Sequence, residues 1–267
     1  MSDLAAAALL GVVQGLTEFL PVSSTAHLIL VSDVLKLDPE QFGLSFDVAL
    51  HFGTALAVLL SFARTWWSLL VDLLRGRWRM PLLIAVGTLP AAVAGVLLES
   101  TVERTLRSPT YIVVGLVAGS IAFVVAERLA GQRRSIGELR LFDAIFMGAA
   151  QAIALLPGIS RSGITISSGL LRDLHRDEAT RFSFLLATPV ILGASAKTLL
   201  DARRAAELFA APDVLATGFA ISFVSGLAAV AFMVRFLRAH SLNWFVAYRL
   251  ALAALIVSAL MTGLLAG

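Results

Sequence analysis

Residues 11–27 read GVVQGLTEFLPVSSTAH, and this stretch decides how the rest of the chain is interpreted. It lies in an otherwise apolar N-terminus and carries polar side chains where a membrane protein normally has apolar ones, among them Gln14, Glu18, Ser23, Ser24, Thr25 and His27. Pro21 interrupts a hydrophobic segment that is too short to cross a bilayer, which takes about 20 residues. The stretch therefore predicts a break at membrane depth, where irregular backbone is tolerated only inside protein or beside a wet cavity.

A second stretch, residues 148–163, reads GAAQAIALLPGISRSG and repeats much of this pattern. A glycine, a glutamine three residues later, Leu-Pro and a hydroxyl cluster occur in both. Aligning Gln14 with Gln151 gives an offset of 137 residues, and aligning Pro21 with Pro157 gives 136. Because this is half of the 267 residues, we expect a single membrane domain made of two fused copies, residues 1–133 and 134–267.

The composition assigns the chain to the integral membrane proteins. Hydrophobic residues make up 58% and charged residues only 15%, against roughly 25% charged in a soluble domain. The net charge of +3 does not indicate nucleic-acid binding, because membrane proteins carry extra Lys and Arg in cytoplasmic loops. There are no cysteines, which excludes disulfides and thiol chemistry, and the N-terminus does not resemble a cleaved signal peptide.

Six stretches are long and apolar enough to span a bilayer: residues 43–63, 80–98, 110–126, 182–200, 214–234 and 242–267. Shorter apolar pieces flank the two breaks: residues 4–17 and 27–37, then 141–156 and 164–171. Each pair predicts a re-entrant helical hairpin. The expected fold is an all-α polytopic membrane protein with six transmembrane helices and two hairpins. The remaining segments are interpreted as loops, including 64–79 and 201–213.

Each half contains three spans, so the second copy should enter the membrane from the opposite face and the repeats should be inverted. Of the 21 Lys and Arg residues, thirteen then fall on one side, six on the side of the N-terminus, and Arg161 and Arg249 inside the membrane. The positive-inside rule makes the richer side cytoplasmic. Both termini should therefore be extracytoplasmic, and the tips of the two hairpins should meet near mid-membrane.

The tips carry charges that are expensive in hydrocarbon unless they are paired or hydrated. We therefore expect Glu18 and Arg161 to face one shared pocket. Gln14 lies four residues before Glu18, on the same helix face. Hydroxyls and backbone N–H groups at a helix start favour an anion, and both breaks offer them: Ser23, Ser24 and Thr25, then Ser160, Ser162 and Gly163. With the imidazole of His27, this set suits phosphoryl transfer.

Simpler interpretations compete with this one at several positions. Hydroxyls such as those of Ser162 often only hold membrane helices together. Asp47 and His51 lie four apart on one span and could form a site, but Asp47 lies near a membrane end, which favours a packing or interface role. Arg249 is expected to reach the interface or to pair structurally. A lone intramembrane carboxylate could also serve as a proton relay in a transporter.

At these residues the chain resembles the bacitracin-resistance family of undecaprenyl-diphosphate phosphatases, which are integral membrane enzymes of the bacterial cell envelope. Residues 14–25, QGLTEFLPVSST, are similar to the family's first motif, and residues 157–163, PGISRSG, to its second. Residues 182–189, FSFLLATP, and the pair Tyr248-Arg249 are also similar to family segments. The likeness runs over the whole chain.

The resemblance implies hydrolysis of undecaprenyl diphosphate to the monophosphate carrier and phosphate in the bacterial inner membrane, which supports peptidoglycan synthesis and bacitracin resistance. It also implies a divalent cation, Mg²⁺ or Ca²⁺. Carried over residue by residue, it makes Glu18 a metal ligand or acid/base group, Ser24 the nucleophile, His27 an acid/base or positioning group and Arg161 the diphosphate clamp. Substrate binding falls to Gln14, Ser23, Thr25, Ser160, Ser162 and Gly163.

One position departs from many family members, which carry Glu where this chain has Gln14. This removes one negative charge, so we expect the cation to be held largely by Glu18, substrate oxygens and water. The runner-up function is a transporter or flippase of the lipid monophosphate, because inverted repeats with broken helices are a transporter architecture. The expected partners are the polyprenyl diphosphate and the bilayer, and a homodimer is compatible with the sequence.

Overall fold

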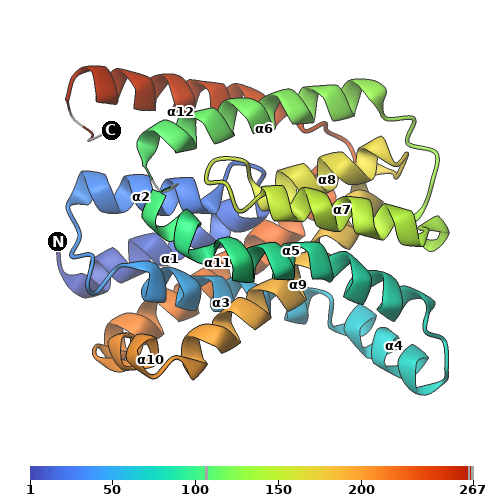
Figure 1. Ribbon diagram of the computed structural model, residues 1–267, viewed down its shortest axis with the longest axis horizontal. Helices are drawn as coiled ribbons and strands as arrows, with labels where there is room; N and C mark the ends of the chain where they lie inside the picture. Colours follow the sequence, from blue (N-terminus) through green and yellow to red (C-terminus); the bar gives the residue numbers. More distant parts are fainter. Residues whose placement is uncertain (106–107, 264, 266–267) are drawn as a thin grey trace.

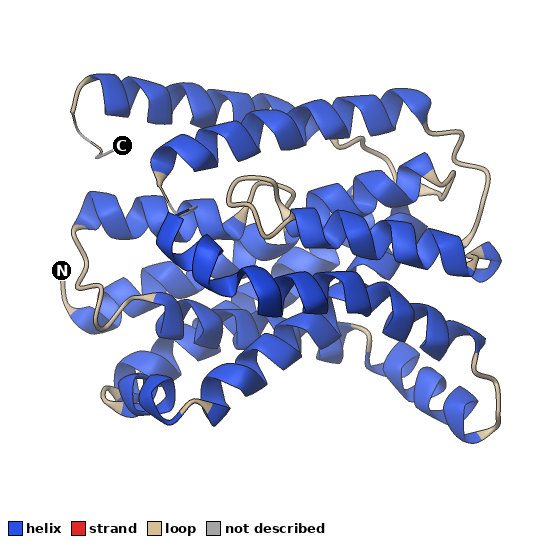
Figure 2. Cartoon of the chain, in the orientation of Figure 1, coloured by secondary structure: helices blue, strands red, loops and turns tan. Residues whose placement is uncertain are grey.

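The computed structural model describes residues 1–105, 108–263 and 265, with the backbone alone at residues 99–100, 103–105 and 207. Within these residues the chain is helix and loop throughout (Figure 2), which confirms the all-α prediction. The helices in chain order are α1 (Asp3–Phe19), α2 (Ser24–Leu35), α3 (Leu44–Ser61), α4 (Ala63–Leu74), α5 (Arg79–Thr105), α6 (Pro109–Leu129), a 3-10 turn (Ile136–Glu138), α7 (Leu141–Ile153), α8 (Arg161–Leu171), α9 (Arg176–Leu200), α10 (Ala202–Phe209), α11 (Pro212–Phe236) and α12 (Asn243–Met261).

Six of these helices are long and apolar enough to cross a bilayer, and they correspond to the six predicted spans: α3, α5, α6, α9, α11 and α12. The chain is therefore a multi-pass membrane protein. Two segments that were expected to be loops are helical instead, α4 within residues 64–79 and α10 within 201–213. Both are short and carry charges among apolar residues, a pattern that suits an interfacial helix as well as a loop.

Each break separates two shorter helices. α1 ends at Phe19, two residues before Pro21, because proline disfavours helical backbone in the residue before it. α2 begins again at Ser24. In the second half α7 ends at Ile153 and α8 begins at Arg161, with the Ser160 hydroxyl accepting a hydrogen bond from Gly163 N at 3.3 Å.

The first short helix of each half packs against a long helix of the other half. α1 packs along α11 of the second half, and α7 packs along α5 of the first half. Both contacts rely on small residues: a Cβ on Gly15 would lie 2.7 Å from the Ser222 carbonyl oxygen, and a Cβ on Gly148 would collide with the Gly87 carbonyl. Close backbone approach of this kind is typical of membrane helix pairs, where packing rather than hydrophobic transfer drives association.

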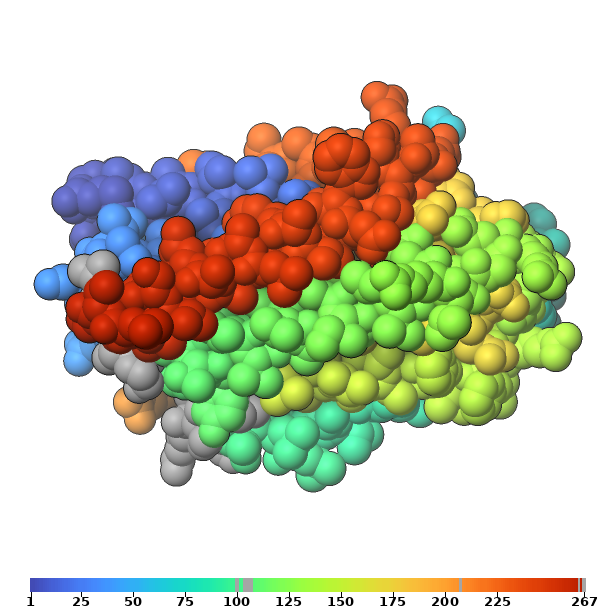
Figure 3. All heavy atoms as spheres, turned by 90° about the horizontal axis from the view of Figure 1, so that it is seen from above, coloured from blue at the N-terminus to red at the C-terminus, as the bar shows by residue number. Residues whose placement is uncertain are grey.

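The last helices of the two halves also pair. α6 and α12 run side by side along one face in Figure 1, and they remain adjacent from above in Figure 3, where α6 is green and α12 red. α3 and α9 pack together on the opposite side of the breaks. The breaks are thereby enclosed by helices from both halves, which is the condition for irregular backbone at membrane depth.

Charged residues tie the loops together at the end of the molecule where α7 begins. Asp143 accepts hydrogen bonds from Arg134 at 2.7 Å and from Arg172 at 2.6 Å. The bond to Asp143 raises the pKa of the Arg134 guanidinium. Glu127 at the end of α6 binds Arg176 at 2.5 Å. These contacts give Asp143 a structural role in holding α7 and α8 against the adjoining loops.

Candidate active site

The two breaks contact each other directly. Ser23 and Ser160, the residues that precede α2 and α8, both have positive φ angles, 75° and 74°. Such backbone is strained for a serine and is found mainly at functional sites. Gly158 N donates to the Ser23 hydroxyl at 3.1 Å, and the Ser162 hydroxyl donates to the Leu20 carbonyl at 3.3 Å. The predicted convergence of the two breaks is confirmed.

Glu18 is the centre of the contacts between the breaks. Its side chain is 2% exposed, and its Oε1 forms an ion pair with Arg161 Nη2. Its Oε2 accepts hydrogen bonds from Ser24 Oγ at 2.5 Å and from Gln14 Nε2 at 3.0 Å. The prediction that Glu18 and Arg161 face one shared pocket is therefore confirmed. They pair directly rather than through a ligand or water, and the pairing offsets the cost of removing both charges from bulk water.

A cavity of about 260 Å³ opens beside this ion pair, and we call it the polar cavity because charged and hydroxyl side chains occupy part of its otherwise apolar wall. Six of the ten predicted site residues line it: Glu18, Ser23, Ser24, Thr25, Ser160 and Arg161. Apolar residues of α3, α5 and α9 form much of the remaining wall, among them Val48, Ala91 and Ile191. The cavity therefore combines one buried acid, one partly buried arginine and several hydroxyls inside an apolar shell, as expected of a site for an anionic head group on an apolar molecule.

The other four predicted residues, all among the described ones, lie outside this lining. Gln14 still contacts Glu18. His27 donates from Nδ1 to the Ser23 carbonyl at 2.7 Å, and its Nε2 bonds the Tyr248 hydroxyl at 2.7 Å. The Ser162 hydroxyl joins the breaks, and a Cβ on Gly163 would collide with the Phe123 ring. These four residues therefore pack against the breaks outside the cavity and help to hold the lining residues in place.

His51 belongs to the site, although the sequence favoured another role for it. It was expected to have a packing or interface role, but its Nε2 lies 3.3 Å from Glu18 Oε2, and the ring lines the cavity. Its Nδ1 donates to the Asp47 carbonyl one turn earlier at 2.7 Å, which aims Nε2 away from α3. Nothing in the local pattern links position 51 to position 18, because the link depends on how α3 packs beside α1.

The sequence left two alternatives open for Arg249, reaching the interface or pairing structurally. The first is wrong, because its side chain is fully buried, and the second is confirmed by its hydrogen bonds. Its guanidinium donates to the carbonyls of Pro21 at 3.2 Å and Gly158 at 2.8 Å, one in each break. It also bonds Gly115, Leu116 and Ser120 of α6 and lies 4.6 Å from the Phe123 ring centroid. Arg249 thus anchors both breaks to α6.

The arrangement around Glu18 has the features of an activated nucleophile. The Ser24 hydroxyl lies within hydrogen-bond reach of a carboxylate, at the first residue of α2, where the helix dipole and free N–H groups favour an anion. Arg161, at the first residue of α8, faces the same carboxylate. A phosphate group in the cavity would therefore meet a hydroxyl with a base on one side and a guanidinium on the other.

The donor set for a cation is sparse. Among the described residues no group of three or more His, Cys, Asp or Glu side chains could hold a metal ion. The oxygen donors around Glu18 include its own carboxylate and the Ser24 hydroxyl. The Gln14 carbonyl oxygen Oε1 lies outside the cavity lining, but it is buried and has no hydrogen-bond partner in the described part of the chain. This set fits a hard cation that keeps waters and substrate oxygens in its shell.

Comparison with known proteins places the chain in a family. A family profile described as "Bacitracin resistance protein BacA" matches residues 7–255. The chain is 44% identical to the Undecaprenyl-diphosphatase of Rubrobacter xylanophilus, with 98% of this chain and all of the relative covered. It is 40% identical to the protein of that name from Corynebacterium diphtheriae, with 96% and 94% covered, and 41% identical to that from Acidothermus cellulolyticus, with 97% of each covered.

The likeness thus covers nearly the full length of both chains, and the matched range, residues 7–255, spans both breaks. The chain belongs to the bacitracin resistance protein BacA family.

Proposed function

We propose that the protein is an undecaprenyl-diphosphatase, a membrane enzyme that hydrolyses undecaprenyl diphosphate to undecaprenyl phosphate and inorganic phosphate. The observation that carries this proposal is the hydrogen bond from Ser24 to a carboxylate that also pairs with Arg161 in one cavity. The family relationship and the names of the relatives support it. Purified protein should release phosphate from undecaprenyl diphosphate, and Ser24→Ala should abolish the release.

In the proposed first step, Ser24 Oγ attacks the terminal phosphorus and its proton passes to Glu18. The bond between that phosphorus and the bridging oxygen breaks, and undecaprenyl phosphate leaves with the proton that Glu18 received. Water then attacks the phosphoserine and gives one proton to Glu18, which passes it to Ser24 Oγ as the bond between Ser24 Oγ and the phosphorus breaks and inorganic phosphate leaves. Arg161 exchanges its contact with Glu18 for the phosphate oxygens, whose negative charge its planar fork matches.

Ser24 is a better candidate nucleophile than Ser23, because Ser23 Oγ is occupied by Gly158 N whereas Ser24 Oγ faces Glu18. Trapping a phosphoenzyme and mapping its site tests this assignment. Label on Ser24 supports it, and label on Ser23 overturns it. We further propose that Thr25, Ser160, Ser162, Gly163 and Gln14 contribute to substrate binding, directly from the cavity wall or by holding the residues that line it.

The two histidines take different roles in this scheme. Since His51 Nδ1 donates to a carbonyl, the contact between its Nε2 and Glu18 needs a proton between the two groups. We assign His51 to sharing the proton that Glu18 receives. His27, which the family resemblance made an acid/base or positioning group, is assigned to positioning, because it holds the Ser23 carbonyl and stacks against Tyr248.

We propose that a divalent cation, Mg²⁺ or Ca²⁺, assists the reaction. Glu18 and the unpartnered Gln14 oxygen would hold it together with substrate oxygens and water. When bound, such an ion neutralises charge on the diphosphate. Activity after exhaustive chelation, followed by stepwise return of each metal, tests this proposal, and full activity in the chelated protein overturns it.

We also propose that the two break regions are re-entrant hairpins in inverted repeats, residues 1–133 and 134–267, with both termini extracytoplasmic. The exchange of α1 onto α11 and α7 onto α5, and the matched φ angles of Ser23 and Ser160, support this arrangement. Because the chain has no cysteines, single cysteines introduced at Ser2 and in the loop at Arg133 can be labelled from either side. Labelling of both from the same side overturns the proposal.

A flippase for the lipid monophosphate is the alternative function, and the same exchanged packing favours it. It predicts movement of labelled lipid phosphate between leaflets even in the Ser24→Ala variant. A homodimer in the membrane is a separate proposal, which measurement of the mass in detergent tests.

A further inference from the structure

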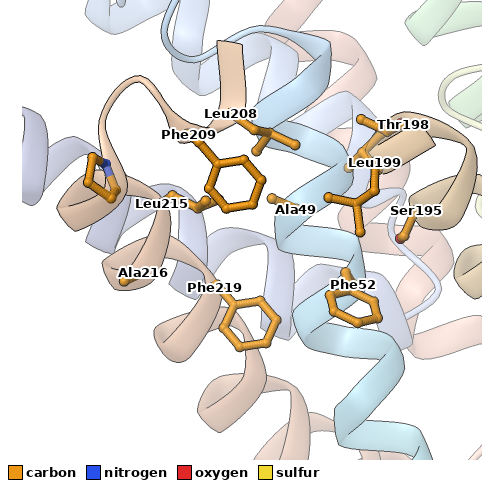
Figure 4. A pocket seen from close by; sticks show the side chains of 12 residues that line it. Ala49, Phe52, Ser195, Thr198, Leu199, Leu208, Phe209, Leu215, Ala216 and Phe219 are labelled. Atoms are coloured by element: carbon orange, nitrogen blue, oxygen red, sulfur yellow. The ribbon is translucent and has the colours of Figure 1, made fainter. Parts of the chain in front are cut away.

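Figure 4 shows a second cavity, of about 400 Å³. Four helices enclose it: α3 contributes Ala49 and Phe52, α9 contributes Leu199, α10 contributes Leu208 and Phe209, and α11 contributes Leu215, Ala216 and Phe219. Its lining is almost entirely apolar, and its phenylalanine rings lie around the space in Figure 4. The proposed hydrolysis does not involve this cavity.

The two cavities adjoin each other. Val48 of α3 and Ser195 of α9 line both the polar cavity beside Glu18 and the apolar cavity. The Ser195 side chain is 3% exposed, and its hydroxyl has no hydrogen-bond partner among the described residues. Burying a hydroxyl without a hydrogen-bond partner costs free energy. Ser195 lies at the boundary between the two cavities, where the polar head of a bound lipid would join its apolar tail.

We infer that the apolar cavity holds the first isoprene units of the lipid substrate while the diphosphate occupies the polar cavity. This inference rests on the proposed function, because that function supplies the head group. The Ser195 hydroxyl would then donate to the oxygen that joins the diphosphate to the prenyl chain. The branched, rigid isoprene units match a space walled by rings and branched side chains, and the shared wall fixes the head beside Ser24.

The cavity would select the lipid by shape complementarity, and not by removing apolar surface from water. The polyprenyl tail is already dissolved in hydrocarbon, so moving it from lipid into the cavity removes little apolar surface from water. What the cavity adds is close contact and a fixed direction for the first units, which favours isoprenoid over straight acyl chains. The structure therefore predicts an effect on KM and on lipid selectivity.

Filling the cavity tests this inference. Ala49→Phe and Ala216→Phe each place a ring in the space from a different helix, and Ala220→Phe adds the same ring one turn further along α11 at an exposed position outside the lining. We expect KM for undecaprenyl diphosphate to rise about tenfold in the first two variants. We expect no change in Ala220→Phe, nor in any variant with a diphosphate that carries no isoprene unit.

A binding measurement separates this inference from the proposed function. A polyprenyl diphosphate with a photoreactive diazirine on its second isoprene unit should label α3, α10 or α11, and Ala49→Phe should reduce that labelling. Labelling confined to α5, α6 or α12, or an unchanged KM in both cavity variants, overturns the inference while phosphate release stands. Labelling at the cavity without any phosphate release keeps the tail site and overturns the proposed enzyme. Equal competition by straight-chain phospholipid assigns the cavity to bilayer lipid and also overturns the inference.

Discussion

The two breaks have similar backbone conformations but carry different side chains. Ser23 and Ser160 have nearly the same positive φ and are separated by 137 positions, as are Gln14 and Gln151. At the same offset, however, Glu18 corresponds to Leu155 and Ser24 to Arg161. The first break thus carries the acid and the candidate nucleophile, and the second carries the positive charge.

This difference shows how a duplicated unit can build an asymmetric site. Two acidic breaks would repel each other in a medium of low dielectric constant, whereas one acid and one base attract each other and a phosphate group can enter between them. Arg249 lies outside both breaks and donates to a carbonyl in each. The two different loops are therefore held by one common anchor.

Among the charged residues of the two breaks, the largest effect is expected for the acid. Glu18→Ala should lower kcat by about 10³-fold, because it removes the base from Ser24 and leaves Arg161 without its partner. Phosphate release with saturating lipid measures this. Leu155→Ala, at the corresponding position in the second break and also in the cavity wall, should retain most activity. Restored activity in a Glu18→Leu and Leu155→Glu double variant would show that the two breaks are interchangeable.

The guanidinium of the second break comes next. Arg161→Lys should lower kcat/KM by about 10²-fold, because lysine keeps the charge but loses the planar fork. The matched control is Arg172→Lys, which changes an arginine that binds Asp143 outside the cavity. Equal losses in both variants would mean that Arg161 acts through stability alone.

The shared anchor should affect stability more than chemistry. Arg249→Lys should destabilise the protein by about 2 kcal/mol, because lysine offers fewer donors to four buried carbonyls and Ser120. Thermal unfolding in detergent measures this, with the largely exposed Arg238→Lys as the control. If the transition temperature stays the same, Arg249 does not hold the two breaks.

Substitution of either histidine should lower kcat by a smaller factor than substitution of Glu18 or Arg161. His51→Ala is expected to lower kcat by about tenfold, since it removes the group that shares the proton of Glu18. His27→Ala should change kcat less, because its ring contacts Ser23 and Tyr248 instead. Comparison of the two pH–rate profiles is the measurement. The reverse order of effects would return the acid/base role to His27, as the sequence resemblance first indicated.

The smallest effects are expected at the strained serines. Glycine adopts positive φ without strain, which is worth about 1 kcal/mol, but it loses the side-chain hydrogen bond. Ser160→Gly loses only a local cap, whereas Ser23→Gly loses the bond to Gly158 of the other break. Ser160→Gly should therefore be the more stable variant in thermal unfolding. A more stable Ser23→Gly would mean that the Ser23–Gly158 bond contributes little.

The sequence alone determined the membrane class, the six spans, the two breaks and a pocket shared by Glu18 and Arg161. These follow from rules that act locally or along the chain, because apolar length sets a span, proline ends a helix, and a buried acid needs a base. The two short helices α4 and α10 escaped this reasoning, because an interfacial helix and an interfacial loop have similar composition.

Only the tertiary structure decided which side chains from distant helices complete the site. His51 reaches Glu18 because α3 packs beside α1, and Arg249 reaches both breaks because α12 lies along α6. His27 faces Tyr248 for the same reason. Periodicity assigns a residue to a face of its own helix, but the partner of that face depends on how the helices pack, which is a property of the whole folded chain.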